Sequence, residues 1–293
     1  MASPNWSYYA NNSSRGREGR KRNVVFGFEG PAGRHRQGTI QHATLQPGRQ
    51  SRHRNGNGGI GAGIARGLLE CGATVLIAGR NAAKNEAALA DLGKIGPPVT
   101  AFVMDVTVEA ECKAVVAEAV KRHGRLDILV NNAGGGIPKP PQELTLPEWN
   151  KVIDVNLTSA FVLSQAAYPE MNKAGGGKII NIGSMASHMG GPMWTAYGPA
   201  KAGIVQLSKN CASAWAKDNI QVNTILPGYI DTDLTKKMQS NAPFHERAML
   251  RTPAGRMGTP DDFAGIAAFL ASRASDFITG AEIMVDGGLL WGV

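Results

Sequence analysis

Residues 126–134 read Leu-Asp-Ile-Leu-Val-Asn-Asn-Ala-Gly, and this stretch decides the fold class of the chain. The apolar run Leu126–Val130 ends in two asparagines, an alanine and a glycine, which predicts a buried strand followed by a turn. Ligands of a parallel sheet lie beyond the carboxyl ends of its strands. Asn131–Gly134 is therefore a candidate binding segment.

Apolar runs and helical periods alternate from residue 55 onward. The other runs are Thr74–Ala78, Val99–Met104, Lys178–Ile182, Ile220–Ile225 and Ala281–Val285. Helices are expected to begin near Ile60, Ala82, Glu109, Leu146, Thr195 and Asp261. Strands that are apolar on both faces and alternate with helices indicate a parallel sheet covered on both sides. We therefore expect an α/β chain in which residues 55–293 form a single domain with a Rossmann-type doubly wound parallel sheet.

Positive charge is concentrated in the first 54 residues. The chain has 31 Lys and Arg against 23 Asp and Glu, a formal net charge of +8. Residues 1–54 hold ten of the basic and two of the acidic side chains, so the whole excess belongs to this segment. We therefore expect no nucleic-acid partner for the domain that follows. Apart from Val24–Phe28 the segment has little to bury, a composition typical of disorder.

Cysteine and hydropathy patterns favour a cytoplasmic location. The three cysteines are an odd number without paired spacing, which indicates reduced thiols rather than disulfides or metal ligands. No apolar run is long enough to span a bilayer, and the N-terminus lacks the apolar core of a secretory signal. We expect no metal and no membrane partner.

Three short motifs indicate a dinucleotide site. The glycine-rich stretch Asn55–Gly61 opens a predicted helix, where backbone N–H groups can receive a pyrophosphate, although such a turn is often only structural. Asp105-Val106 ends a predicted strand, and its carboxylate could accept from an adenine amino group or cap a helix. Pro227–Thr232 ends another and could hold a carboxamide, although a plain proline-glycine turn fits equally well.

Tyr197 and Lys201 carry the strongest chemical signal. Their i, i+4 spacing places them on one helix face, and Ser184 lies upstream at the end of a predicted strand. Such a pair alone is usually a solvated face, but an ammonium beside a phenol favours phenolate. We therefore expect Lys201 to lower the pKa of Tyr197 from about 10. Tyr197 could then exchange a proton with an oxygen held by Ser184, while a nicotinamide exchanges the hydride.

In this order the motifs resemble those of the short-chain dehydrogenase/reductase family, and the resemblance covers Asn55–Val293. It implies a nicotinamide-dependent enzyme that acts on CH-OH groups of a small molecule. The catalytic positions correspond to Asn156, which would order a relay water, Ser184, Tyr197 and Lys201, which would also bind the nicotinamide ribose. The residues expected to hold the cofactor are Gly56, Asn57, Gly59, Ile60, Gly61, Arg80, Asp105, Val106, Asn132, Ala133, Gly134, Tyr197, Lys201, Pro227, Gly228, Ile230 and Thr232. Asp286-Gly287-Gly288 resembles a signature often found at a tetramer interface, so we expect a homotetramer or homodimer.

The chain departs from the family pattern in two places. Pro199 removes a backbone donor from the catalytic helix, but it lies near the helix start, where we expect it to be tolerated. The Thr-Gly of the family's dinucleotide turn is replaced by Arg54-Asn55, and Gln50–His53 cannot be read as a first strand. That strand normally lies in the middle of the sheet, so we expect the sheet to lack its centre.

Residues 1–54 are therefore expected to be a basic segment that is disordered or mistranslated. Codons can be chosen for Arg49–Gly56 that, read one base forward, spell Gly-Lys-Val-Ala-Ile-Val-Thr, an apolar strand ending in the missing threonine. A methionine codon is possible in that frame at His42. We predict that the natural protein begins near position 42 in the shifted frame. A genuine basic extension is the alternative.

Arg80 favours NADP as the cofactor. No acidic residue lies between Gly72 and Asn85 to bind a ribose 2′-hydroxyl, whereas an arginine accommodates a 2′-phosphate. NAD stays usable if Arg80 merely faces solvent. By its overall texture the sequence resembles gluconate and deoxygluconate dehydrogenases, with a 3-oxoacyl-acyl-carrier-protein reductase as the alternative. A non-catalytic dinucleotide sensor is an alternative of another class, although such proteins usually lose the catalytic tyrosine or lysine.

The substrate pocket is expected between the catalytic face and residues 231–258. Its wall would comprise Met189, Met193, Trp194 and Tyr229. His188 could hydrogen-bond a polar substrate, although an ordinary loop residue is the simpler interpretation. Four basic side chains could attract a carboxylate or simply face solvent on a lid helix: Lys236, Lys237, Arg247 and Arg251.

Overall fold

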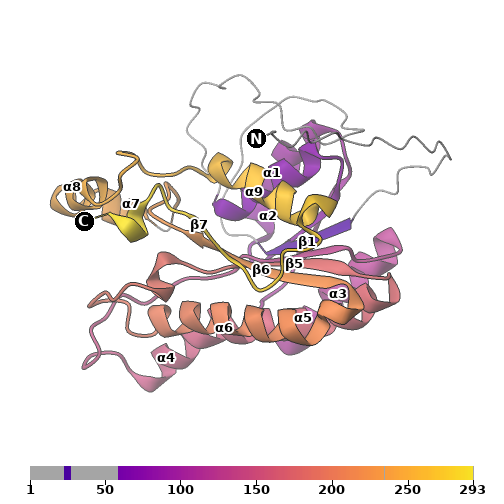
Figure 1. Cartoon of the computed structure of the whole chain (residues 1–293), viewed down its shortest axis with the longest axis horizontal. Helices are drawn as coiled ribbons and strands as arrows, with labels where there is room; N and C mark the ends of the chain where they lie inside the picture. The colour runs from indigo at the N-terminus through magenta and orange to yellow at the C-terminus, as the bar shows by residue number, and fades with distance from the viewer. Residues whose placement is uncertain (1–22, 28–58, 234, 293) are drawn as a thin grey trace, which may run out of the picture.

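A computed structural model describes residues 23–27, 59–233 and 235–292 of the chain (Figure 1). Within these residues, seven parallel strands form one sheet in the order β3-β2-β1-β4-β5-β6-β7. The strands are β1 (Asn23–Gly27), β2 (Thr74–Gly79), β3 (Val99–Val103), β4 (Ile128–Asn131), β5 (Gly177–Ile182), β6 (Ile220–Pro227) and β7 (Glu282–Val285). The helices are α1 (Ile60–Glu70), α2 (Ala82–Leu92), α3 (Glu109–His123), α4 (Leu146–Ile153), α5 (Ser159–Lys173), α6 (Tyr197–Trp215), α7 (Lys236–Gln239), α8 (Ala242–Leu250) and α9 (Ala264–Ala271). The parallel α/β architecture expected from the sequence is confirmed.

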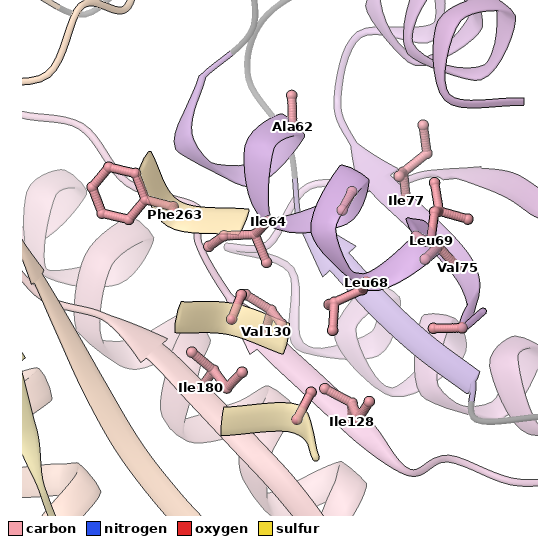
Figure 2. Packing of buried hydrophobic residues seen from close by; sticks show 14 of the residues in the cluster. Ala62, Ile64, Leu68, Leu69, Val75, Ile77, Ile128, Val130, Ile180 and Phe263 are labelled. Carbon is pink, nitrogen blue, oxygen red and sulfur yellow. The ribbon is translucent and has the colours of Figure 1, made fainter. Parts of the chain in front are cut away.

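Helices cover both faces of the sheet, as its apolar strands require. Figure 1 shows α1, α2 and α9 over one face and α3, α4, α5 and α6 over the other, with α7 and α8 beyond one end. Side chains of successive strand residues alternate between the two layers. Ile128 and Val130 pack under α1 (Figure 2), whereas Leu129 belongs to the core beneath α3 and α5. Strands β2, β4 and β6 are buried throughout for this reason.

The centre of the sheet is occupied, contrary to the expectation from the sequence. Strand β1 pairs with β2 on one side and β4 on the other, with Val25 opposite both Leu76 and Leu129. Its sequence, Asn-Val-Val-Phe-Gly, overlaps the one apolar run noted in the N-terminal segment. Parallel strands pair when their side-chain patterns suit the sheet, whatever their separation along the chain. Residues 23–27 can therefore form the central strand although residues 28–58 separate them from α1. The expected strand at Arg49–Asn55 lies outside the described residues.

Helix α1 packs unusually closely on the segment that leads into α9. A Cβ atom at Gly63 would collide with the backbone of Pro260, and one at Gly67 would lie 2.7 Å from the Cα of Ala264. The helix axis can come this near only because both positions lack a side chain. This contact sets where the first turn of α1 stands over the sheet.

The strand order reverses direction between β1 and β4. The chain builds β2 and β3 on one side of β1, and then β4 to β7 on the other. In a doubly wound sheet this switch point leaves a crevice outside the carboxyl ends of the strands. The part of the chain that the structure describes contains no helix both long and apolar enough to cross a membrane.

Candidate functional site

Helix α6, which carries the expected catalytic residues, begins at Tyr197, two residues later than the sequence indicated. Pro199 is its third residue, where helix N–H groups have no intrahelical acceptor, so the missing donor costs nothing there. Lys201 follows Tyr197 by one turn and is only 3% exposed. The expected tolerance of Pro199 is confirmed by the unbroken helix.

Tyr197, Lys201 and Ser184 meet at the carboxyl end of β5. The Ser184 side chain hydrogen-bonds Tyr197, and its Oγ also accepts from the backbone N–H of Ala186, 3.1 Å away. Lys201 Nζ lies 5.7 Å from the centre of the Tyr197 ring and donates to the Ile182 carbonyl at 2.8 Å. The strand end, the turn after it and the first helical turn thus bring the three side chains together.

Burial controls the acid–base state of this cluster. It raises the pKa of Tyr197, and the Ser184 hydrogen bond only partly opposes this. Burial also lowers the pKa of Lys201 to about 8. The expected lowering of the Tyr197 pKa by Lys201 is therefore wrong for this structure. Taking both groups out of water disfavours the phenolate and the ammonium alike, and no carboxylate among the described residues forms an ion pair with Lys201.

Asn156 joins the site through a π-helical segment, Asp154–Thr158, between α4 and α5. Its Nδ2 donates to the carbonyls of Gly135 (2.7 Å) and Val152 (2.8 Å), and its Oδ1 accepts from the Gly135 N–H (3.2 Å). The extra residue of such a turn exposes backbone and side-chain groups that an α-helix would hide. Asn156 therefore clamps the loop that follows β4 against the helix.

The loop after β4 lies close to Asn156, Tyr197 and Lys201, the expected catalytic residues that lie on helices. A Cβ atom at Gly134 would lie 2.7 Å from Asn156 Oδ1 and 3.1 Å from Lys201 Nζ. One at Gly136 would reach the Tyr197 ring at 3.5 Å. No role was expected for Gly135 or Gly136 from the sequence. Their position in the run Gly134-Gly135-Gly136 was the available signal of a close backbone approach.

A buried polar network anchors α6 to the sheet, and it was not expected from the sequence. Asn131 Nδ2 donates to Asn181 Oδ1 (2.7 Å), and Asn181 Nδ2 donates to Ser208 Oγ on α6 (2.7 Å). Thr224 on β6 donates to the same hydroxyl at 2.8 Å. Asn181 and Thr224, polar residues inside predicted strands, were the available sequence signal. The network fixes α6 relative to β4, β5 and β6.

The expected pyrophosphate side of the site lies at the N-terminus of α1. Gly59 is its N-cap and supplies no side-chain acceptor, so the first-turn N–H groups of Ile60 and Gly61 remain available to an anion. Gly56 and Asn57 lie outside the described residues.

The expected adenine side of the site contains a small cavity and an arginine–aspartate pair. Val106, Asn132 and Ala133 line one small cavity together with the end of β4 and the first residues of α5. Arg80 and Asp105 lie beside one another, with Arg80 Nη1 and Asp105 Oδ2 3.7 Å apart. Asp105 is not a helix N-cap, because Val108 holds that position before α3. Its carboxylate instead closes a turn by accepting from the N–H and hydroxyl of Thr107.

The segment after β6 lies close against β7. The Gly228 N–H donates to the Val285 carbonyl at 3.1 Å, and a Cβ atom at Gly228 would lie 2.7 Å from the Asp286 Cα. Ile230 is 4% exposed, and the Thr232 N–H donates to Thr235 Oγ1 at 3.1 Å. Pro227–Thr232 thus returns over the sheet end as a fixed turn.

An apolar wall lies beside Ser184, the expected catalytic serine. Met189, Tyr229 and Leu290 pack against the buried cluster that contains Met185 and Leu289. Trp194 is partly buried, and Met193 is 43% exposed. The C-terminal Leu289 and Leu290 were not among the pocket residues expected from the sequence, because nothing local to them signals that the chain end returns to the site.

The polar candidates around this wall differ in their surroundings. His188 Nε2 lies 2.5 Å from Glu282 Oε2 on β7, and the same carboxylate accepts from Lys209 at 2.7 Å. His188 is therefore held by the sheet edge and is not presented to the pocket. Lys236 pairs with Asp233, while the charge of Arg251 acts on Tyr229 and opposes the rise in the pKa of that phenol caused by burial. The Lys237 side chain lies outside the described residues.

Comparison with known proteins gives consistent matches. A family model described as enoyl-(acyl carrier protein) reductase matches residues 56–290. The 2-dehydro-3-deoxy-D-gluconate 5-dehydrogenase of Bacillus subtilis is 40% identical over 232 residues, 79% of this chain and 91% of that protein. The 3-oxoacyl-acyl-carrier-protein reductase of Chlamydia pneumoniae is 37% identical over 236 residues, 80% of this chain and 94% of that protein. A gluconate 5-dehydrogenase from Burkholderia cenocepacia, solved with NADP and tartrate, aligns at a TM-score of 0.78 and 34% identity over 93% of this chain and 96% of that one.

Proposed function

Because this chain belongs to the short-chain dehydrogenase/reductase family, whose members are NAD(P)-dependent and act on CH-OH groups, we propose that it interconverts a secondary alcohol and a ketone on a sugar acid. The observation that supports the reaction class is that Ser184, Tyr197, Lys201 and Asn156 lie together at the carboxyl ends of the neighbouring strands β4 and β5. A binding protein without turnover has no need of a buried lysine and a serine that both lie beside the same partly buried tyrosine.

Tyr197 is the proton donor and acceptor in this proposal. Its pKa is raised by burial, so its Oη carries a proton at neutral pH and can donate to a carbonyl oxygen. Ser184, already hydrogen-bonded to Tyr197, would hold the same oxygen. Lys201 lies one helical turn from Tyr197 and can pass a proton toward it. Asn156 keeps Gly135 and the loop after β4 in place beside them.

The residues present fit a dinucleotide. The first-turn N–H groups of α1 lack a side-chain cap, and a Cβ atom at Gly134 would fill the space beside Lys201. Ile60 and Gly61 would hold the pyrophosphate, Val106 and Ala133 the adenine, and Lys201 the nicotinamide ribose. The cofactor would supply the hydride.

NADP is the proposed cofactor of preference. Arg80 projects from the end of β2, is half-exposed, and no acidic side chain occurs between Gly72 and Asn85 to bind a 2′-hydroxyl instead. The gluconate 5-dehydrogenase relative was solved with NADP, which supports the same choice.

Two observations support a substrate that carries a carboxylate. Sugar-acid dehydrogenases are among the relatives at about 40% identity. Arg251 acts on Tyr229, a member of the apolar wall, and forms no ion pair with a carboxylate among the described residues. We propose that Arg251 binds the substrate carboxylate while the secondary alcohol or ketone lies against Ser184.

The experiment is a panel of substrates followed by the absorbance of reduced nicotinamide. It compares gluconate and keto-gluconates, neutral polyols, and a 3-oxoacyl thioester, each with both cofactors. We expect turnover of a sugar acid, and we expect Arg251→Ala to raise its KM more than that of a neutral polyol. Preferred turnover of the thioester would assign the chain to the other substrate class, and no turnover of anything would favour a dinucleotide sensor.

A further inference from the structure

The ends of β2 and β3 place an arginine and an aspartate side by side. These strands are neighbours in the sheet, with Gly79 opposite Val103, and the Met104 N–H donates to the Gly79 carbonyl. Arg80 and Asp105 follow directly, so their side chains leave adjacent strand ends. Arg80 Nη1 and Asp105 Oδ2 are 3.7 Å apart, and the two side chains are 53% and 34% exposed.

The aspartate is the rigid member of this pair. Its Oδ1 accepts from the Thr107 N–H at 2.9 Å and the Thr107 hydroxyl at 2.7 Å. Its backbone N–H donates to Glu111 Oε2 at 2.6 Å. With one carboxylate oxygen committed to the turn, Oδ2 is left to face Arg80.

The pair is ionised under any ordinary assay condition. Partial burial favours the protonated carboxyl, but the Thr107 hydrogen bonds and the charge of Arg80 together hold the pKa of Asp105 below its usual range. The carboxylate therefore presents a fixed negative charge to the same guanidinium that a 2′-phosphate would need.

We propose that Asp105 sets the cofactor selectivity of this enzyme by competing with the 2′-phosphate for Arg80. With NAD(H), the Arg80–Asp105 pair persists. With NADP(H), Arg80 must either bind the carboxylate and the 2′-phosphate together or turn from the carboxylate to the phosphate. The preference for NADP(H) over NAD(H) is then weaker than Arg80 alone would give. Asp105 is thus a specificity-determining residue that keeps the site usable by both cofactors. This inference rests on the proposed role of Arg80 as the 2′-phosphate ligand.

The selectivity ratio isolates this effect from any contact of Asp105 with adenine. Adenine is common to both cofactors, so loss of such a contact weakens both equally and cancels in the ratio of their Kd values. Asp105→Asn keeps an oxygen acceptor for Thr107 while removing the charge. Asp105→Ser, a second uncharged variant that retains an acceptor, serves if the first fails to fold.

The test measures Kd for NADPH and NADH by fluorescence titration of the full chain. We expect Asp105→Asn to raise the preference for NADPH by about two- to five-fold, the range expected for a largely exposed ion pair. Glu109→Gln is the matched control, because it removes a charge from the first turn of α3 where Glu109 contacts Lys113 and not Arg80. It should leave the preference unchanged.

The same titrations in an Arg80→Ala background separate the possible failures. Competition for Arg80 requires that Asp105→Asn no longer alters the ratio once Arg80 is absent. An undiminished shift in that background would mean direct repulsion of the phosphate by Asp105 and would overturn the inference. If Arg80→Ala alone reduces the NADPH preference but Asp105→Asn does not change it, this inference is wrong while the proposed cofactor choice stands. If Arg80→Ala has no effect on the ratio, both are wrong.

Discussion

Tyr197 and Ser184 form a hydrogen-bonded pair in which burial keeps the phenol protonated. Replacing Tyr197 by phenylalanine removes the transferable proton and little else. We expect Tyr197→Phe to lower kcat by at least about 100-fold, the lower range for loss of a general acid–base group, while the Kd for dinucleotide changes little. Steady-state kinetics and fluorescence titration measure the two quantities.

Tyr168→Phe is the matched control for this change. Tyr168 stacks on Trp215 with 5.0 Å between ring centres, and its hydroxyl donates to Asp218, so it is removed from the acid–base cluster. It should keep wild-type kcat. Retention of most activity by Tyr197→Phe would show that another group transfers the proton.

Lys201 gives a second prediction, about stability and pH. Burial lowers its pKa from 10.5 to about 8, so between these values the unfolded chain binds a proton that the folded chain has released. Stability due to this residue therefore rises with pH across that window. Burial raises the pKa of all three cysteines, which acts in the opposite direction at high pH, so the informative quantity is a difference between variants.

The measurement is the free energy of unfolding in urea for the wild type and Lys201→Met, in steps from about pH 7 to about pH 10. We expect the free energy of unfolding of the wild type to rise, relative to that of Lys201→Met, by on the order of 2 kcal/mol over that range. Parallel curves for the two proteins would mean that Lys201 titrates as an exposed lysine does.

At the scale of elements, the contact between α1 and the segment entering α9 depends on Gly63. A Cβ atom there meets the backbone of Pro260, which cannot move aside as a flexible side chain would. We expect Gly63→Ala to destabilise the fold by about 1–3 kcal/mol, the usual cost of overpacking, and to weaken dinucleotide binding by shifting the α1 N-terminus. Gly265→Ala, on α9 with no atom near its Cβ position, is the control and should be neutral or slightly stabilising. Equal stability of the two variants would contradict the close packing.

The central strand gives a prediction about the gene. The family match begins at residue 56, whereas the strand that fills the centre of the sheet is Asn23–Gly27, well before it. We propose that the natural protein carries an apolar strand directly before Gly56, encoded in the shifted frame. Resequencing should then show codons for residues 49–55 that read one base forward as an apolar strand, and the repaired protein should be the better folded and more active one. If those codons cannot be read so, Asn23–Gly27 is the natural central strand.

At the scale of the whole molecule, apolar side chains remain on surfaces away from the site. Phe161 on α5 is 47% exposed and Met284 on the edge strand β7 is 36% exposed. Long helices and a free sheet edge are surfaces that a second copy could cover. We expect a homotetramer, or at least a homodimer, by light scattering at micromolar concentration. A monomeric mass would contradict this assembly.

Much of the architecture could be read from the chain because it depends on local pattern. Apolar runs located β2 to β7 to within about two residues, since the strands of a sheet covered on both faces are predominantly apolar. The first residues of α1, α2, α3 and α4 were also predicted correctly. The i, i+4 spacing of Tyr197 and Lys201 and the position of Ser184 at a strand end sufficed to predict that they would meet.

The sequence by itself therefore determined the parallel α/β fold, the reaction class and the residues that converge at the carboxyl edge of the sheet. Only the tertiary structure decided the rest, because it depends on partners distant in the chain. These include which segment fills the central strand, the direction of the Tyr197 pKa shift and the pairing of Arg80 with Asp105. The packing of Leu290 into the apolar wall beside Ser184 also depends on such partners. Periodicity reports which face of an element is buried, but burial depth and the neighbouring charge are set only when separate strands and helices pack together.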